Sequence, residues 1–174
     1  IPLRLVGSEM CIRDRAKKNA MYQYRSKQEL AITIDEAWDF LSNPKNLKLI
    51  TPKYMGFDII SGADRIMFPG QIIQYRLTPI LGIPFRWVTE ITHVKKGSYF
   101  VDEQRFGPYT FWHHKHFINK SNNGVIMEDI VDYKLPLGPI GWLAHKLFVK
   151  FKVRQIFKYR EQALDKICLL YTSP

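Results

Sequence analysis

Acidic, basic and imidazole side chains alternate with aromatic rings along residues 100–133, and they are the chain's best candidates for chemistry. Two strand-like runs meet there at a Gly-Pro turn. The first run carries Glu103 and Arg105, and the second carries His114 and His116. A half-buried strand usually alternates apolar and polar residues, so that one face stays dry. Ionisable groups on a buried face must therefore pair with one another or contact a ligand.

A histidine beside a carboxylate is a common acid–base pair, because the carboxylate and burial tune the pKa of the imidazole. Pairing of His114 with Glu103, or of His116 with Asp129, would form such a pair. The alternative is a buried cross-strand network in which these groups neutralise one another and never touch a substrate. Both interpretations stay open, and Glu103, His114 and His116 are treated as candidate catalytic residues.

Arg105 has two possible roles. It could stabilise an anion or an enolate, or it could pack on the ring of Trp87 or Trp112 as a cation–π pair, which is the simpler interpretation. His114 and His116 share a strand face, but strand neighbours alone do not give tetrahedral metal geometry. We therefore expect no metal site. The sequence has no phosphate-binding loop and no Ser/His/Asp arrangement, and we expect no cofactor.

The elements that position these residues can be read from hydrophobic periodicity and turn residues. The predicted strands cover residues 22–34, 57–61, 71–78, 84–94, 99–106, 110–119 and 124–135. Helical segments are predicted at 35–42 and 46–50, and a long amphipathic helix at 140–166. A meander of strands closed by one helix favours an α+β fold, in which a curved antiparallel sheet of about seven strands wraps around the C-terminal helix.

The turns predict the strand registers and hence the face that looks toward the helix. A three-residue turn at 95–97 places Thr89 opposite Glu103, and a tight turn at 107–110 places Glu103 opposite His114. A four-residue Ser-Asn-Asn-Gly turn places His116 beside Asp129. The ligand-facing residues that follow are Trp87, Tyr99, Glu103, Arg105, Trp112, His114, His116, Met127, Asp129 and Tyr133 from the strands, with Leu147 and Phe151 from the helix.

The two ends of the chain look like translated sequencing adaptor. The reverse complement of codons for the segment 168–173 encodes Met10-Cys-Ile-Arg-Asp14 in a shifted frame. We therefore assign residues 1–15 and 168–174 to adaptor sequence of metagenomic type, and residues 16–167 to one authentic domain. Both cysteines, Cys11 and Cys168, fall in the excluded ends, so no disulfide or thiol chemistry is expected.

The net charge of +10 suggests an anionic partner, although a basic soluble protein is the simpler interpretation. Lysine and arginine recur every four residues along the last helix, at Lys146, Lys150, Arg154 and Lys158. This stripe is a solvated face or a transient contact with an anionic membrane. No stacking motif accompanies it, so we expect no nucleic acid. No run is long enough to span a bilayer, and we expect a cytoplasmic monomer.

Several motifs resemble one superfamily over residues 22–165. They are Trp38-Asp-Phe-Leu-Ser-Asn-Pro44, Phe68-Pro-Gly70, Gly82-Ile-Pro84, Val101-Asp-Glu-Gln-Arg-Phe-Gly-Pro-Tyr109 and Trp112-His-His114 with His116. These motifs and the order of elements are similar to the START-like superfamily with the helix-grip fold, also called SRPBCC, which includes birch-pollen allergens and polyketide cyclases. The motifs are most similar to those of a bacterial branch of this superfamily. The resemblance implies a cavity for hydrophobic ligands between the sheet and the long helix.

Three functions are compatible with these features. The favoured one is binding of a small hydrophobic or amphipathic ligand such as a lipid, a quinone or a polyketide-like molecule, without catalysis. The second is a cyclase or dehydratase that uses Glu103, His114 and His116 as acid–base groups, with Arg105 stabilising the enolate. The third is an interaction scaffold fused to other domains. A cavity above about 300 Å³ lined by the predicted inner face would favour the first two.

Overall fold

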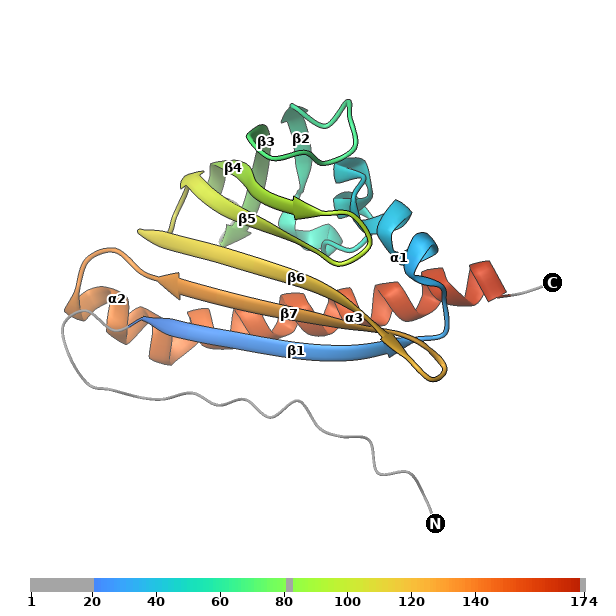
Figure 1. Cartoon of the computed structure of the whole chain (residues 1–174). Coiled ribbons are helices and arrows are strands. Elements are labelled where there is room, and N and C mark those ends of the chain that lie inside the picture. Colours follow the sequence, from blue (N-terminus) through green and yellow to red (C-terminus); the bar gives the residue numbers. More distant parts are fainter. Residues whose placement is uncertain (1–20, 81–82, 173–174) are drawn as a thin grey trace, which may run out of the picture.

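The computed structural model describes residues 21–80 and 83–172 of the chain. Its seven strands form one antiparallel sheet in the order β1-β7-β6-β5-β4-β3-β2. The strands are β1 (Tyr22–Leu30), β2 (Asp58–Ser61), β3 (Gln71–Ile80), β4 (Ile83–Lys95), β5 (Tyr99–Phe106), β6 (Phe111–Ser121) and β7 (Gly124–Lys134). Figure 1 shows the sheet curving around the long C-terminal helix. The predicted α+β class and the wrapped sheet are confirmed.

Three short helices follow β1 and cover one end of the sheet. They are α1 (Ile34–Leu41), η1 (Pro44–Lys48) and η2 (Lys53–Met55), of which the last was not predicted. Thr33 caps α1: its hydroxyl accepts from the backbone N–H of Glu36, whose carboxylate accepts in turn from the backbone N–H of Thr33. This capping box satisfies two N–H groups that a helix start leaves without partners.

The C-terminal helix runs through α2 (Pro139–Ala144), one π-helical turn η3 (His145–Val149) and α3 (Lys150–Thr172). A π turn inserts one extra residue, which rotates the following helix by about 100° relative to a regular α-helix. The residues facing the sheet are therefore Val149, Val153 and Phe157. Leu147 and Phe151, predicted to face the ligand, point outward and are 64% and 57% exposed. That part of the prediction is wrong.

The register between β6 and β7 is the predicted one, with His116 opposite Asp129. The strands turn at Asn122 and Asn123, and Gly124 takes a φ of 145°. A Cβ at Gly124 would lie 2.1 Å from the backbone oxygen of Leu30, so only glycine fits there.

The registers on both sides of β5 differ from the prediction. The β4–β5 hairpin closes at the Lys95–Tyr99 pair, one residue later than the predicted turn, and a bulge at Thr92 then shifts the pairing by one residue. Thr89 therefore lies opposite Gln104 and not opposite Glu103. The β5–β6 turn is also wider than a tight hairpin, because the side chain of Gln104 bonds the backbone of Tyr109 in both directions. Asp102 therefore lies opposite His114. A shift of one residue reverses the faces of a strand.

The reversal puts Asp102 and Phe100 on the inner face of β5, where they line the cavity described below. Tyr99, Glu103 and Arg105 alternate with them and lie on the opposite face. On that outer face Arg105 forms ion pairs with Glu90 and Glu103, and His113 bonds Glu103 as well. The predicted pair of Glu103 with His114, and the predicted inward position of Arg105, are wrong.

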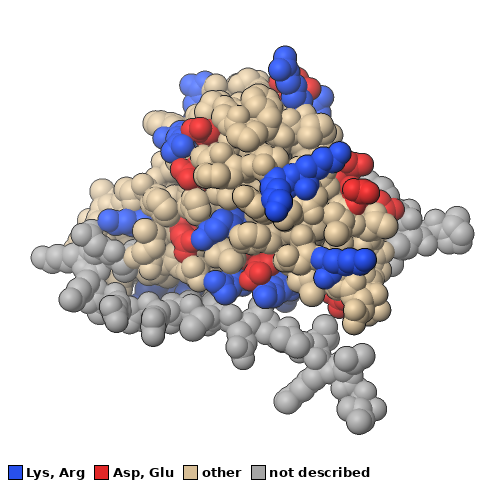
Figure 2. Space-filling view, in the orientation of Figure 1, with Lys and Arg blue, Asp and Glu red and all other residues tan. Residues whose placement is uncertain are grey.

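The outer face of the sheet is charged and paired. Lys115 lies 2.9 Å from Asp132, and Lys27 lies 3.5 Å from Glu128. Figure 2 shows positive and negative side chains interspersed over this side of the molecule. Such interspersed pairs make the outer face a solvated surface.

The buried apolar residues form three clusters between sheet and helices. One surrounds Trp38 and Leu164, a second surrounds Tyr133 and Phe157, and a third surrounds Ile73 on β3. Cys168, in the segment assigned to adaptor, is buried in the first cluster. The N-terminal segment 1–15 lies outside the described residues. None of the helices in the described part of the chain combines the length and apolar character that a bilayer span requires.

Candidate ligand-binding site

A cavity of about 490 Å³ lies between the inner face of the sheet, the short helices and the C-terminal helix. All three apolar clusters border it. Its volume lies within the range of about 300–1,000 Å³ that is usual for small-molecule sites. The aromatic residues in its wall are Phe40, Tyr54, Phe57, Tyr75, Phe85, Trp87, Phe100, Tyr109, Trp112, Phe148 and Phe157. The cavity is therefore mainly apolar.

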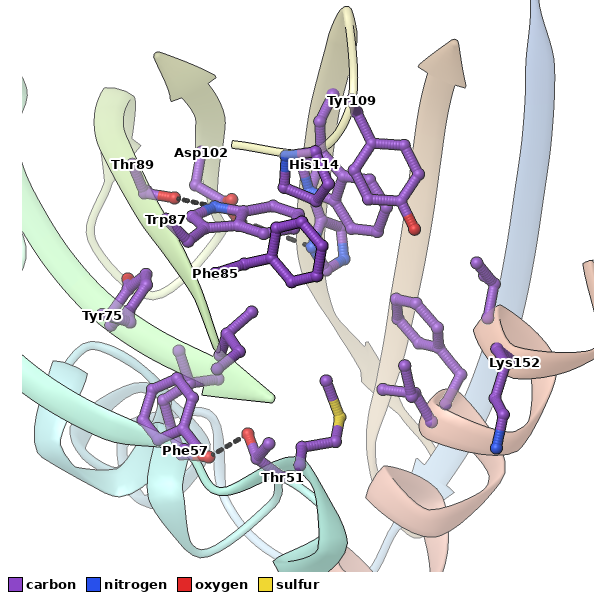
Figure 3. Close-up of a pocket in the computed structure, with 18 of the residues that line it drawn as sticks. Thr51, Phe57, Tyr75, Phe85, Trp87, Thr89, Asp102, Tyr109, His114 and Lys152 are labelled. Carbon is purple, nitrogen blue, oxygen red and sulfur yellow. Dashed lines mark hydrogen bonds and ion pairs between the residues drawn. The ribbon is translucent and has the colours of Figure 1, made fainter. Parts of the chain in front are cut away.

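The aromatic wall is densest where β4, β6 and the β5–β6 turn meet. The rings of Trp87 and Trp112 lie edge to face at 5.3 Å between centroids, and Tyr109 packs on both. The indole N–H of Trp87 donates to the hydroxyl of Thr89 at 2.9 Å. Figure 3 shows Trp87, Phe85, Tyr109 and His114 gathered at this side of the cavity. Edge-to-face contacts hold the rings in fixed positions and leave their faces for a ligand.

The mouth of the cavity lies between η2 and the start of α3. Lys152 lies over the ring of Tyr54, with 5.1 Å between its ammonium nitrogen and the ring centroid. Both residues line the cavity and both are exposed. This cation–π contact joins α3 to η2 across the entrance.

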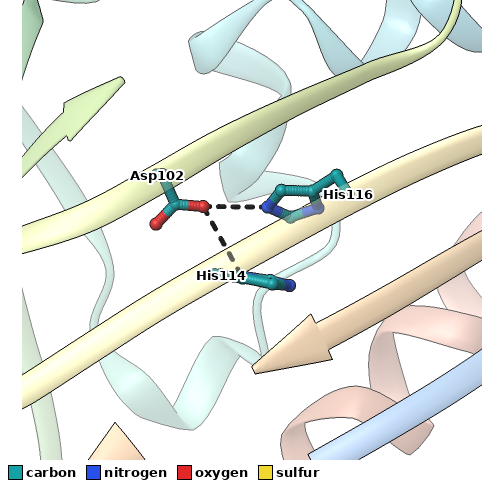
Figure 4. Close-up of side chains that lie close together, drawn as sticks. All are labelled: Asp102, His114 and His116. Carbon is teal, nitrogen blue, oxygen red and sulfur yellow. Dashed lines mark hydrogen bonds and ion pairs between the residues drawn. The ribbon is translucent and has the colours of Figure 1, made fainter. Parts of the chain in front are cut away.

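Five ionisable side chains form what we call the buried polar cluster: Asp102, His114, His116, Asp129 and Arg160. Asp102 Oδ2 lies 2.8 Å from His116 Nε2 and 3.5 Å from His114 Nδ1. Figure 4 shows the carboxylate of Asp102 turned toward both rings. Asp129 Oδ1 lies 3.0 Å from His114 Nε2 and 2.8 Å from His116 Nδ1. Each imidazole is therefore held between two carboxylates.

The ionised carboxylates of this cluster are stabilised by their buried neighbours. Burial alone would raise the pKa of both carboxyls, but the histidine hydrogen bonds and the Arg160 charge outweigh it, so the pKa of Asp102 is lowered and that of Asp129 lies well below its usual range. Burial and the neighbouring His116 ring lower the pKa of His114 to about 4. His114 is thus neutral at pH 7, while both carboxylates are ionised.

Arg160 is a cavity-lining residue that the sequence pattern missed. It comes from α3 and is 8% exposed, and its Nη2 lies 3.7 Å from Asp129 Oδ1 and 3.3 Å from His116 Nδ1. Its Nε is buried without a hydrogen-bond partner, and Arg160 is one of the residues that line the cavity. An arginine among apolar helix positions is the signal that could have indicated it.

The predicted ligand-facing residues divide into three groups. Trp87, Trp112, His114 and His116 line the cavity. Met127, Asp129 and Tyr133 are buried beneath it, in apolar contacts for Met127 and Tyr133 and in the polar cluster for Asp129. Tyr99, Glu103, Arg105, Leu147 and Phe151 are absent from its wall. Asp102, which the predicted register placed outside, takes the position that Glu103 was expected to fill.

No protein-family model and no curated protein sequence matches the chain. Solved structures do match its fold. A protein of Thermus thermophilus has a TM-score of 0.67 and 13% identity, over 87% of this chain and 99% of that one. Norcoclaurine synthase from Thalictrum, a point mutant bound to a transition-state analogue, has a TM-score of 0.65 and 14% identity, over 89% and 98% of the two chains.

Ara h 8.0201 matches with a TM-score of 0.59 and 12% identity, over 86% of this chain and 99% of that one. The chain has the helix-grip fold. The resemblance to START-like proteins, drawn from the sequence motifs, is confirmed at the level of the fold. At identities this low, the helix-grip fold transfers without the ligand or the activity of any neighbour.

Proposed function

We propose that this helix-grip protein binds a small amphipathic ligand in the cavity between sheet and helix. The observation that carries the proposal is the cavity of about 490 Å³, with an aromatic wall and one buried polar cluster. Pockets that bind small molecules combine a large apolar surface with a few converging polar groups. The apolar body of the ligand would lie among the rings of Trp87, Trp112 and Phe85.

The polar group of the ligand would lie against the buried polar cluster. Arg160 borders the cavity and has a buried N–H without an acceptor, so a carbonyl, hydroxyl or carboxylate oxygen on the ligand would satisfy it. His114 and His116 border the same region. Flat aromatic surfaces favour a ligand with a ring system, and we propose a quinone or a polyketide-like molecule ahead of a simple lipid chain.

A cavity-filling substitution tests this proposal. Ala144 lines the cavity, and Ala144→Phe would place a ring in it. Ala31 is exposed after β1, so Ala31→Phe is the matched control. We expect an environment-sensitive dye such as anilinonaphthalene sulfonate to bind the wild type and Ala31→Phe equally, and to bind Ala144→Phe at least tenfold more weakly. Equal binding by all three proteins would refute a ligand site in this cavity.

A second proposal concerns how such a ligand enters. Exposed apolar residues lie beside the cavity just before α2, on α2 and η3, and at the start of α3. These residues, here called the apolar rim, are Leu137, Ile140, Trp142, Leu143, Leu147, Phe148 and Phe151. Three of them, Leu137, Ile140 and Phe148, also line the cavity, so the rim is continuous with it. An apolar patch of this size usually marks an interaction surface.

We propose that the apolar rim docks on an anionic lipid bilayer. Lysines lie beside it: Lys146 packs over the Trp142 ring at 5.5 Å, and Lys150 and Lys152 follow along the helix. A surface with apolar side chains at its centre and lysines beside it suits the boundary between acyl chains and anionic headgroups. Of the predicted stripe, Lys146 and Lys158 are exposed, and Lys150 and Arg154 are half-buried.

Vesicle sedimentation tests the docking. We expect the protein to bind phosphatidylglycerol-containing vesicles more strongly than phosphatidylcholine vesicles, and Leu147→Ser to lose most of this binding. Ile60→Ser, at an exposed apolar position on β2, is the control that should bind normally. A dimer of the wild type that dissociates on Leu147→Ser would instead identify the rim as a contact between two copies and overturn the membrane proposal.

Acid–base catalysis of the cyclase or dehydratase kind remains the second candidate function. The observation that favours it is the position of His114 and His116 in the cavity wall beside Asp102. Glu103 has no part in it, because it faces the other side of the sheet. His114→Gln should abolish turnover and spare ligand binding if the protein is an enzyme. If His114→Gln loses ligand binding as well as turnover, His114 holds the ligand and is not an acid–base group.

A further inference from the structure

The two histidines of the buried polar cluster present their ring nitrogens in a particular way. His114 Nε2 and His116 Nδ1 both contact the same oxygen of Asp129, at 3.0 Å and 2.8 Å. An ionised carboxylate only accepts hydrogen bonds, so His114 Nε2 carries a hydrogen toward Asp129, and His116 Nε2 carries one toward Asp102 while His116 Nδ1 accepts from Arg160 Nη2. His114 Nδ1 then has a lone pair, and His116 Nε2 gains one when its proton moves to Nδ1, which lies 2.8 Å from Asp129 Oδ1.

His114 Nδ1 and His116 Nε2 face one oxygen of Asp102. His116 Nε2 lies 2.8 Å and His114 Nδ1 lies 3.5 Å from Asp102 Oδ2, and the three candidate ligand atoms all lie within 4.8 Å of one another. With metal–ligand bonds of about 2.1 Å, neighbouring ligand atoms are separated by roughly 3.0 Å in an octahedron and roughly 3.4 Å in a tetrahedron. The observed separations from the Asp102 oxygen are close to those values.

We propose that Asp102, His114 and His116 bind a divalent transition-metal ion, with Asp129 orienting both imidazoles from behind. Two histidines and one carboxylate suit Zn²⁺ or Fe²⁺ and leave coordination positions open. Asp102, His114 and His116 line the cavity whereas Asp129 does not, so the open positions face the cavity. This inference does not depend on the proposed organic ligand.

The neighbouring residues support Asp102, His114 and His116 as the metal ligands and Asp129 as the residue that orients the two histidines. Metal-binding histidines usually donate their second N–H to a carboxylate, which fixes the tautomer and the ring orientation. Arg160 lies 3.7 Å from Asp129 and compensates its charge. Asp102 is then the carboxylate that remains to bind the metal. Arg160 Nη2 donates to His116 Nδ1 at 3.3 Å, and a metal on His116 Nε2 would replace this bond by one from His116 Nδ1 to Asp129 Oδ1, 2.8 Å away.

The sequence alone predicts no metal site, because two histidines on one strand do not by themselves give tetrahedral geometry. The third ligand, Asp102, was placed on the wrong face of β5 by the register error. Once β5 is paired correctly, Asp102 lies directly opposite His114. Three adjacent antiparallel strands then hold the four side chains, which makes the site rigid.

Metal titration of the tag-free, chelator-treated protein tests the inference. We expect one Co²⁺ per chain with a visible ligand-field spectrum, displaced by one Zn²⁺. Asp102→Asn and His116→Gln should weaken binding at least 100-fold, and Asp129→Asn by about 10–100-fold. His113→Gln, on the outer face of the same strand, is the matched control and should bind as the wild type does.

X-ray absorption of the wild-type zinc complex keeps the test independent of variants that fail to fold. The inference predicts two imidazole ligands with oxygen ligands and no sulfur. Absence of stoichiometric binding would overturn it. So would sulfur ligation, which would assign the metal to cysteine, or a loss of binding in His113→Gln alone. Retention of the dye-binding cavity in a protein that binds no metal would refute this inference while leaving the proposed function intact.

Discussion

Replacing Arg160 by methionine removes a buried positive charge while keeping most of the apolar stem. Arg160 Nη2 lies 3.7 Å from Asp129 Oδ1. With an effective dielectric constant of about 20, two unit charges at this separation attract by roughly 4–5 kcal/mol. Measured losses for one partner of a buried ion pair are about 3–5 kcal/mol. We expect Arg160→Met to lower the free energy of unfolding by about 3–5 kcal/mol at pH 7.

Urea unfolding at equilibrium, followed by circular dichroism, measures this loss. Lys158→Met, at an exposed position on the same helix, should change stability by less than about 0.5 kcal/mol. The double variant Asp129→Asn with Arg160→Met should lose less than the sum of the single losses, because the two charges compensate each other. A loss below about 1 kcal/mol for Arg160→Met, or strict additivity in the double variant, would refute the attraction between Arg160 and Asp129.

Three further outcomes are expected. The pKa of His114 falls from 6.5 to about 4 on folding. Its contribution to the free energy of unfolding, about 3 kcal/mol, is therefore complete above pH 6.5 and is lost as the pH falls through 4. The lowered pKa values of Asp102 and Asp129 add acid sensitivity below pH 4. Equal urea midpoints at pH 7 and pH 4.5 would contradict it. Gly124→Ala should cost about 1–3 kcal/mol in urea unfolding, because its φ of 145° and its contact with the backbone exclude a side chain, and an unchanged midpoint would disprove that constraint. Asp102→Asn should strengthen binding of the anionic dye about fivefold, since one negative charge leaves the cavity wall, whereas Glu103→Gln should leave it unchanged; the opposite result would restore the register predicted from sequence.

Local signals were enough to predict the order of elements and the pairing of β6 with β7. The Asn-Asn-Gly turn sets that register, and it placed His116 beside Asp129, as the structure has it. The capping residue Thr33 is likewise a local signal. Each of these features depends on residues close in the sequence, which periodicity and turn chemistry describe well.

The position of β5 could not be predicted in the same way. The bulge at Thr92 changes the count of residues by one, and Gln104 closes the next turn with its side chain. Neither event alters the alternation of residues along the strand, so the pattern fits both faces. The π turn at 145–149 has the same effect on the helix. Arg160 was missed because its partner His116 is 44 residues away.

Native mass spectrometry of the purified protein tests the ligand-binding proposal most directly. We expect a population of the protein that carries one bound molecule of a few hundred daltons. This molecule should be released on denaturation and be identifiable from its exact mass. The same population should be missing from Ala144→Phe and present in Ala31→Phe. A wild-type spectrum that contains the bare chain alone, together with no uptake of quinone or polyketide-like compounds added in excess, would contradict the central claim.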